Sequence, residues 1–112
     1  MRVLVCGGRD YISLSRVCIE LDKLDPKPTL LISGHARGAD QLAEQWAKEN
    51  NIPTRLFPAD WDKYGKRAGY LRNVKMLEEG NPDLVVAFPG GKGTNMMIAI
   101  AESADIPVIK IS

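Results

Sequence analysis

Three glycine-rich segments of the chain combine a flexible backbone with charged or hydroxyl side chains. They read Gly7-Gly8-Arg9-Asp10, Ser33-Gly34-His35-Ala36-Arg37-Gly38-Ala39-Asp40 and Pro89-Gly90-Gly91-Lys92-Gly93-Thr94. A glycine-rich turn that leads into a helix lets backbone N–H groups approach an anion, and the helix dipole favours the negative charge. Each segment alone is also typical of a plain tight turn. Together they predict a site for a phosphate-bearing ligand.

Positive charge gathers near the same segments. Arg9, Arg37 and Arg72 are the strongest candidates for phosphate contact, because a guanidinium group can donate two parallel hydrogen bonds. A solvated surface role fits any single lysine at least as well. Eight of the fifteen lysine and arginine residues follow predicted strand ends, namely Arg9, Arg37, Lys63, Lys66, Arg67, Arg72, Lys75 and Lys92.

Residue spacing argues against several other classes of site. The chain has no GxxxxGK[ST] motif and no GxGxxG after its first predicted strand, which disfavours a P-loop NTPase or an ordinary dinucleotide dehydrogenase. Cys6 and Cys18 have no metal-ligand spacing, so we expect reduced thiols, no disulfide and no metal site. His35, the only histidine, lacks a nearby Ser or Cys nucleophile signature. It fits a ligand contact and a passive loop residue equally well.

Three aromatic residues have two possible roles each. Trp61 and Tyr64 lie in a long segment without clear periodicity, 58–68, where they could stack on a nucleobase or simply pin the loop to the domain. Trp46 falls on a helical apolar stripe, which predicts a core or interface position.

The elements that must position these residues alternate along the chain. Short apolar runs predict strands at 3–6, 29–32, 55–57, 84–88 and 108–111, covered on both faces. Helical periodicity predicts helices at 14–24, beginning after an N-cap at Ser13, and at 39–47, 70–79 and 97–104. This pattern predicts an α/β fold, a three-layer Rossmann-like open sheet of about five mainly parallel strands with helices on both faces. Ligands of such sheets bind outside the carboxyl ends of the strands, where the three glycine-rich segments fall.

Composition limits the class of protein. The 112 residues are 45% hydrophobic and 26% charged with a net charge of +1, which predicts a single domain spanning 1–112. The near-neutral charge argues against a nucleic-acid partner bound through the whole surface. No apolar run approaches the ~18 residues of a membrane span, and no signal peptide is evident. We therefore expect no membrane partner and a cytoplasmic location.

The glycine-rich segments carry resemblances to two known families. The loop 89–94 resembles the PGGxGT motif of the Lonely Guy (LOG) phosphoribohydrolases, and the loop 33–40 is similar to the SGxARGxD loop of the DNA-processing protein A (DprA) family. Both families belong to the SLOG superfamily. The whole pattern, which also includes Gly7-Gly8-Arg9-Asp10-Tyr11, Pro58-Ala59-Asp60-Trp61 and Arg72-Asn73, most resembles the small YspA-type branch found in bacteria and phages.

The LOG resemblance implies a catalytic arginine and a catalytic glutamate that cleave an N-glycosidic bond. Arg72 falls at the arginine position, next to Asn73 where LOG proteins have lysine, but Met97 occupies the glutamate position. Methionine can neither stabilise an oxocarbenium-like centre nor activate water. A substitute carboxylate would have to be Asp10, Asp40 or Glu44, and the catalytic candidates are then Arg72, Asp40 and Asp10.

These observations favour a module that binds a nucleotide or nucleotide-derived ligand, as a sensor or a sequestering protein, without a further cofactor. The alternatives are a phosphoribohydrolase-like N-glycosidase with a relocated acid and a single-stranded DNA-binding protein of DprA type. Related families form dimers, and the small size and apolar helix faces of this chain are compatible with a homodimer. The predicted ligand contacts are Gly7, Gly8, Arg9, Ser33, Gly34, His35, Arg37, Gly38, Asp40, Trp61, Arg72, Asn73, Pro89, Gly90, Gly91, Lys92, Gly93 and Thr94.

Overall fold

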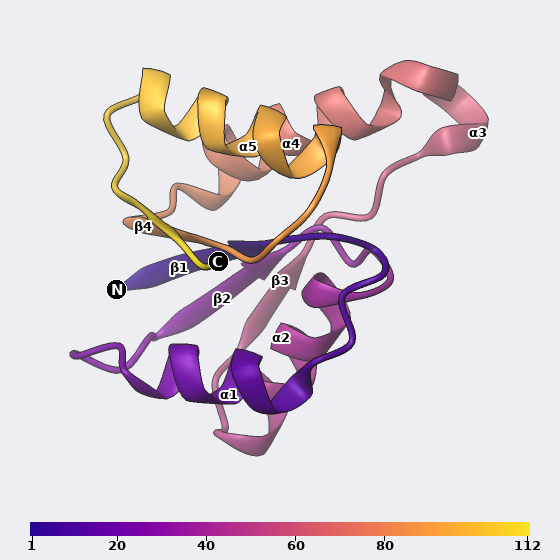
Figure 1. The fold of residues 1–112 in the computed structure, drawn as a ribbon. Coiled ribbons are helices and arrows are strands. Elements are labelled where there is room, and N and C mark those ends of the chain that lie inside the picture. Colours follow the sequence, from indigo (N-terminus) through magenta and orange to yellow (C-terminus); the bar gives the residue numbers. More distant parts are fainter.

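The computed structural model describes residues 1–112 and contains five strands that alternate with helices (Figure 1). The elements are β1 (Arg2–Cys6), α1 (Leu14–Asp22), β2 (Leu30–Ser33), α2 (Ala39–Glu49), β3 (Thr54–Leu56), α3 (Trp61–Tyr64), the 3₁₀ turn η1 (Gly65–Arg67), α4 (Ala68–Gly80), β4 (Leu84–Ala87), α5 (Lys92–Ser103) and β5 (Val108–Lys110).

All five strands are parallel and lie in the order β3-β2-β1-β4-β5. Val5 is paired with Ser33 on one side and with Val86 on the other, so β1 lies at the centre. The chain builds outward from β1 in one direction and then, after β3, crosses back to place β4 on the other side of β1. The strand order therefore reverses between β1 and β4, which is where open α/β sheets bind ligands.

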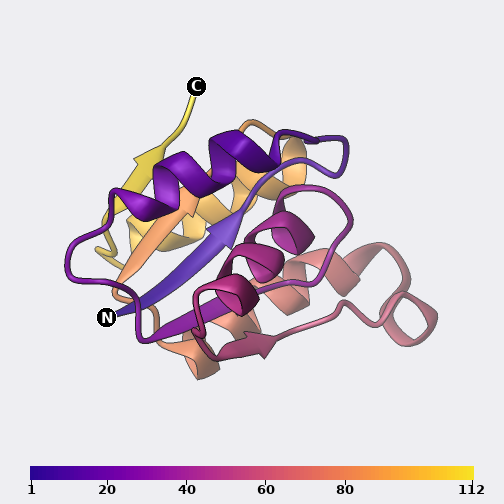
Figure 2. The same ribbon diagram turned by 90° about the horizontal axis from the view of Figure 1, so that it is seen from below.

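Helices cover both faces of this sheet. α1 and α2 lie against one face and α4 and α5 against the other, as Figures 1 and 2 show from two directions. Alternate residues of β1 follow this division: Val3 and Val5 pack in the core under α1 and α2, and Leu4 and Cys6 pack under α4 and α5. Period-two alternation of strand side chains produces this division. The three-layer Rossmann-like prediction is confirmed.

Two of the predicted strands are less covered than expected. All three residues of β3 are exposed, and β5 has one half-buried and two exposed residues. Both strands lie at the edges of the sheet, where helices overhang them only in part. The expectation of strands covered on both faces was correct for β1, β2 and β4 and wrong for the two edge strands.

The segment 58–68, expected to be irregular, contains short helical structure. The Asp60 side chain accepts a hydrogen bond from the Lys63 N–H at 3.1 Å and so caps α3, and η1 then continues into α4. An aspartate at this position is a strong helix-start signal. The same signal at Ser13, which accepts from the Arg16 N–H at 3.3 Å, was correctly predicted for α1.

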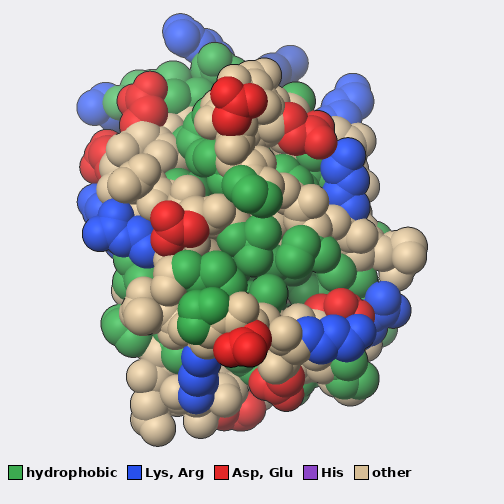
Figure 3. Space-filling view, turned by 90° about the vertical axis from the view of Figure 1, so that its left-hand side faces the viewer, with side chains coloured by type: hydrophobic (Ala, Val, Ile, Leu, Met, Phe, Trp, Pro, Cys, Tyr) green, Lys and Arg blue, Asp and Glu red, His purple; other side chains and the backbone are tan.

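The amino-terminal end of the sheet lies opposite the glycine-rich loops. In Figure 3 an apolar centre is surrounded there by interspersed positive and negative side chains. None of the helices is long and apolar enough to cross a membrane.

Candidate functional site

Backbone hydrogen bonds hold the three glycine-rich loops together at the carboxyl end of the sheet, on the right in Figure 1. The Gly8 N–H donates to the Pro89 carbonyl at 2.9 Å, and the Gly8 carbonyl accepts from the Ala39 N–H at 3.1 Å. The loop after β1 is thus joined both to the loop after β4 and to the start of α2. The Tyr11 and Phe88 rings, with centroids 5.5 Å apart, add a side-chain contact between the same loops.

Gly38 makes this close approach possible. Its φ of 89° lies in a region that side-chain-bearing residues rarely adopt. A Cβ at this position would lie 2.6 Å from both the carbonyl carbon and the carbonyl oxygen of Arg9. Gly38 therefore serves loop packing.

The main cavity of the site measures about 420 Å³ and lies over the ends of β1 and β4. Its walls come from the loop after β1, α4 and the first turns of α5. Four lysine or arginine side chains border it, and Asp40 is the only acidic residue that does. The lining residues are Cys6, Gly7, Gly8, Arg9, Ala36, Asp40, Trp61, Lys66, Gly69, Tyr70, Arg72, Asn73, Met76, Gly91, Lys92, Gly93, Thr94, Met96 and Met97.

A second cavity of about 280 Å³ adjoins the first, on the side of the loop after β2. The two share Arg9, Ala36, Trp61 and Arg72. The remaining lining residues are Gly34, His35, Arg37, Pro58 and Ala59.

Two helices begin at this end without a side-chain cap. The N-cap residues of α2 and α5 are Gly38 and Gly91, and neither can accept a hydrogen bond from the first-turn N–H groups. A side chain added at Gly91 or Gly93 would meet no atom within 4 Å. The first turn of α5 therefore faces open space with free backbone donors and the positive end of its dipole, a combination suited to an anion.

Arg72 links α4 to the loop after β2. Its Nη1 donates to the Gly34 carbonyl at 2.7 Å, and its Nε donates to Asn73 Oδ1 at 3.0 Å. The Asn73 amide in turn donates to the Gly93 carbonyl at 3.3 Å. Burial lowers the pKa of Arg72, and the nearby Asp40 carboxylate partly offsets this effect. The guanidinium group remains charged at neutral pH and is held in one orientation.

Asp40 is a buried carboxyl group on the cavity wall, 6% exposed. Its Oδ2 accepts a hydrogen bond from the Ala36 N–H at 3.2 Å. Burial raises the pKa of Asp40 to about 6, although that hydrogen bond and the Arg72 charge act in the opposite direction. A carboxyl group with a pKa near neutrality can give or take a proton under physiological conditions.

This pKa makes a testable prediction for Asp40→Asn. Because the folded-state pKa lies above the ordinary value of 3.8, the contribution of Asp40 to stability is fully present below pH 3.8 and is lost as the pH rises through about 6. Asparagine keeps an acceptor for the Ala36 N–H and carries no charge. We expect the variant to match the wild type near pH 4 and to be more stable by up to about 3 kcal/mol at pH 7.5. Urea unfolding at both pH values measures this, and an equal difference at both would contradict it.

Hydrogen bonds connect three side chains, those of Ser33, His35 and Glu44, at the wall of the second cavity. Glu44 on α2 accepts from the buried Ser33 hydroxyl at 2.6 Å and contacts His35 Nδ1 at 2.8 Å with its other oxygen. The Ser33 Oγ also accepts from the His35 N–H at 3.1 Å. The His35 ring, 45% exposed, is thereby fixed at the cavity wall.

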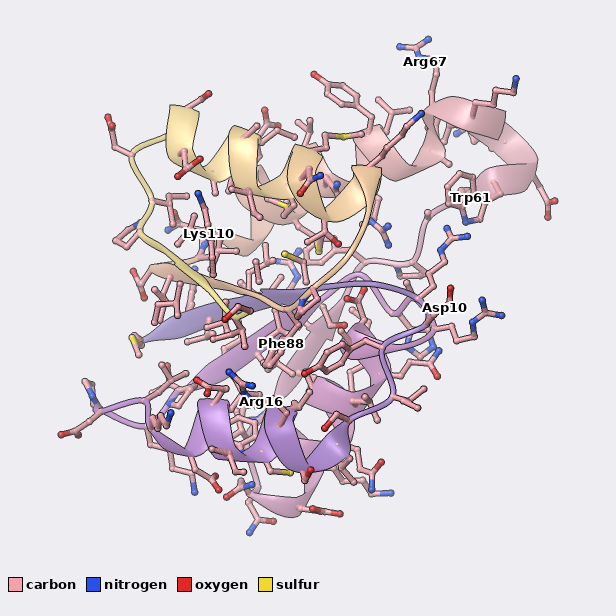
Figure 4. All side chains as sticks on the ribbon, in the orientation of Figure 1. Asp10, Arg16, Trp61, Arg67, Phe88 and Lys110 are labelled. Carbon is pink, nitrogen blue, oxygen red and sulfur yellow. The ribbon has the colours of Figure 1, made fainter.

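Arg9 and Trp61 meet across the entrance of both cavities. The Arg9 guanidinium lies 5.2 Å from the centre of the Trp61 ring, within the range of a cation–π contact. Figure 4 shows Trp61 projecting from α3 toward the loop that carries Asp10. Asp10 itself points into solvent, with a side chain 97% exposed, and pairs with Arg37 at 3.2 Å.

The predicted ligand residues divide into two groups. Most line one of the two cavities, but Ser33, Gly38, Pro89 and Gly90 do not. These four hold the loops: Ser33 bonds to Glu44, Pro89 to Gly8, and a Cβ at Gly90 would overlap Thr94. Of the carboxylates weighed as catalytic, only Asp40 lines the main cavity. Asp10 lines neither cavity and pairs with Arg37, and Glu44 is engaged by Ser33 and His35.

The predicted positive residues also divide. Arg9, Arg37, Lys66, Arg72 and Lys92 line one of the two cavities. Lys63 and Lys75 line a groove of about 620 Å³ beside β3, which borders on the site at Pro58 and Arg72. Arg67 points away from the site, as Figure 4 shows.

Eight residues that line the main cavity were not among the predicted ligand contacts, namely Cys6, Ala36, Lys66, Gly69, Tyr70, Met76, Met96 and Met97. The spacing of Gly69, Asn73 and Met76 along α4 follows the helical period, so Arg72-Asn73 could have pointed to this face. Burial raises the pKa of Cys6 to about 12, which keeps the thiol protonated at neutral pH. Met97 is 1% exposed and packs in the core beneath the cavity.

The chain has clear relatives. It is 39% identical to the Gene 61 protein of Mycobacterium phage D29, over 96% of this chain and 94% of the phage protein. It also resembles the UDP-GlcNAc 2-epimerase of Neisseria meningitidis in structure, with a TM-score of 0.56 and 21% identity over 99% of this chain. The chain spans about a third of that enzyme's length (32%), so the likeness concerns the fold. Residues 1–64 match the family described as "YspA, cpYpsA-related SLOG family". The chain belongs to this SLOG family.

Proposed function

We propose that the chain binds a nucleotide or nucleotide-derived ligand in the main cavity. The observation that carries this proposal is the cavity itself: about 420 Å³, bordered by Arg9, Lys66, Arg72 and Lys92 and by the uncapped start of α5. Ligand pockets for small molecules commonly have volumes of about 300–1,000 Å³ and a few convergent polar groups. Membership of the SLOG family and the Rossmann-like fold support a nucleotide-related ligand.

The phosphate group would lie at the first turn of α5. Lys92 and the buried Thr94 belong to that turn and line the cavity, and the turn has no side-chain cap for its backbone N–H groups. Glycine at positions 91 and 93 leaves the approach open. Arg72, fixed by Gly34 and Asn73, would face the ligand from the opposite wall. The positive charges of Lys92 and Arg72 would then oppose the negative charge of the phosphate.

The nucleoside would lie toward Trp61 and Tyr70. Both aromatic side chains line the cavity and are about half exposed, at 48% and 49%. An aromatic ring that is only half covered can accept a stacked base, which every nucleobase can supply. The epimerase with the related fold was solved with UDP-GlcNAc bound, which is in keeping with a nucleotide-related ligand.

Binding without turnover is the favoured role, as a sensor or a sequestering protein. Met97 stands where LOG enzymes carry their glutamate, and its side chain is buried in an apolar core. The Cys6 thiol is protonated and is therefore a poor nucleophile. The cavity holds many binding groups and few that can transfer a proton.

Asp40 supports a second candidate function, hydrolysis of an N-glycosidic bond. It is the one carboxyl group on the wall of the main cavity, and burial raises its pKa to about 6. A carboxylic acid with such a pKa can protonate a departing base. Arg72 would then hold the phosphate during the reaction.

A calorimetric titration with the four ribonucleoside 5′-monophosphates tests the binding proposal. We expect at least one to bind, and Gly91→Leu to weaken that binding at least tenfold because the leucine side chain enters the open cavity. Gly91→Ala is the matched control, with a smaller expected loss. Because nothing lies within 4 Å of a Cβ at this position, both variants should keep the melting temperature of the free protein. Absence of binding by all four nucleotides and their bisphosphates would refute the proposal.

Release of free base from the same nucleotides separates the two functions. The binding role predicts no release at high protein concentration over many hours. Base release that is lost in Asp40→Asn, while that variant still binds the nucleotide, would establish hydrolysis instead.

A further inference from the structure

The second cavity contains basic residues that a mononucleotide in the main cavity would not contact. His35, Arg37, Arg9 and Arg72 line it, and no carboxylate does. Two acids contact its lining residues from outside: Glu44 contacts His35 from behind the wall, and Asp10, whose side chain is 97% exposed, contacts Arg37 from the solvent side. Surface pairs of this kind contribute little and are easily replaced by a stronger anion. The cavity is therefore suited to an anionic group.

Two side chains of this cavity are held in place before any ligand arrives. Glu44 contacts His35 Nδ1 at 2.8 Å, which leaves the opposite edge of the imidazole ring free. The Arg37 Nε donates to the Arg9 carbonyl at 3.3 Å, which anchors the base of the guanidinium group. Because the Glu44 carboxylate is an acceptor, Nδ1 carries the proton of this contact, and Nε2 can donate to an anion when the ring is protonated. Side chains that are already oriented lose less conformational entropy when a ligand binds.

The two cavities form neighbouring compartments of one site. Arg9, Trp61 and Arg72 border both, so a ligand that passes beneath Trp61 would contact the same two arginines from either side. One compartment offers the first turn of α5 to a phosphate, and the other offers His35 and Arg37. The volumes of about 420 and 280 Å³ exceed what a single phosphate group needs in each.

We propose that the ligand carries two phosphate groups separated by at least a ribose, one in each cavity, with His35 and Arg37 as the contacts to the second. This inference rests on the proposed function and names the ligand class of the same site. A nucleoside 3′,5′-bisphosphate and a 5′-phosphorylated dinucleotide both have this chemistry. They differ in whether a second nucleoside follows the second phosphate.

Calorimetric titration of the full chain can test the inference with three kinds of probe. These are the ribonucleoside 5′-monophosphates, the matching 3′,5′-bisphosphates and the 5′-phosphorylated dinucleotides. We expect the probes with two phosphates to bind at least tenfold more tightly than the monophosphates. Tighter binding by the dinucleotides than by the bisphosphates would show that the ligand is a dinucleotide, in which a second nucleoside follows the second phosphate.

Variants then assign the second phosphate to its residues. Arg37→Gln and His35→Gln should each weaken binding of the two-phosphate probes at least fivefold and leave monophosphate binding unchanged. Lys110→Gln, on the far strand β5, removes the same charge as Arg37→Gln and should alter neither. This control separates a direct contact from a change in overall charge.

The outcomes distinguish this inference from the proposed function. Equal affinity for one- and two-phosphate probes would overturn the inference and leave nucleotide binding intact. Equal weakening of both kinds of probe by Arg37→Gln would also overturn it. Failure of every probe to bind would overturn both.

Discussion

Replacing Gly38 by alanine is expected to lower the free energy of unfolding by about 3–5 kcal/mol. Two effects add: the residue has φ 89°, and its Cβ would lie 2.6 Å from the backbone carbonyl of Arg9. The neighbouring atoms belong to the backbone and cannot rotate away. Urea unfolding followed by tryptophan fluorescence and far-UV circular dichroism measures the loss. Because small domains are stable by only about 5–15 kcal/mol, partial unfolding at 37 °C is also expected.

Gly93→Ala is the matched control for this prediction. Gly93 lies in the first turn of α5, and an added Cβ there meets no atom within 4 Å. Alanine is a better helix former than glycine by up to about 1 kcal/mol, so stability should stay the same or rise slightly. A urea midpoint for Gly38→Ala equal to that of Gly93→Ala would show that loop packing does not depend on Gly38.

Replacing Arg72 by methionine is expected to cost about 2–4 kcal/mol of stability at neutral pH and to abolish nucleotide binding. The variant loses the hydrogen bonds to the Gly34 carbonyl and to Asn73. It also leaves the buried Asp40 carboxyl group without the positive charge that opposes the rise in its pKa. Urea unfolding measures the first effect, and calorimetric titration with the tightest-binding nucleotide measures the second.

A double-mutant cycle with Asp40→Asn tests the electrostatic part of this prediction. In the Asp40→Asn background the same Arg72→Met change should cost less, because no buried carboxylate is left uncompensated. Arg16→Met is the control: Arg16 pairs with Glu20 on its own helix at 3.1 Å, so its replacement should have the same effect on stability in both backgrounds. An identical cost of Arg72→Met in both backgrounds would mean that Asp40 and Arg72 do not interact.

The sequence predicted the fold class and the order of helices and strands, but not the exposure of the two edge strands or the short helix α3. Apolar runs and helical periodicity predicted the order of elements because burial on both sheet faces demands them. They did not predict that β3 and β5 would be exposed. Exposure follows from a position at the edge of the sheet, and the local sequence does not determine which strands lie at the edges. The short helix α3 (Trp61–Tyr64) was not predicted because four residues are too few to show helical periodicity, although an aspartate at position 60 is a typical N-cap residue.

For the candidate site, the sequence likewise predicted its location but not the role of each residue. Glycine and arginine at the strand ends identified the right edge of the sheet, because parallel strands bring their carboxyl ends together. Which glycines support the loops and which face the cavity depends on distances between loops, as for Gly38 and Gly91. The lining residue Cys6 lies in an apolar run that predicts a buried strand, and the sequence cannot tell an apolar cavity wall from an apolar core, because both use the same residue types.

The bond between the Gly8 N–H and the Pro89 carbonyl joins residues that are far apart in the chain. It forms only when β4 has been added beside β1, after three-quarters of the sequence has been made. A chain that emerges from the ribosome therefore cannot form the main cavity until β4 and the start of α5 have been synthesised. Any ligand of that cavity binds the finished fold alone, and at a hundred times its dissociation constant it would add about 2.7 kcal/mol to folding. A bound ligand would thus protect completely folded molecules from unfolding and proteolysis, and incompletely folded molecules would not gain this protection.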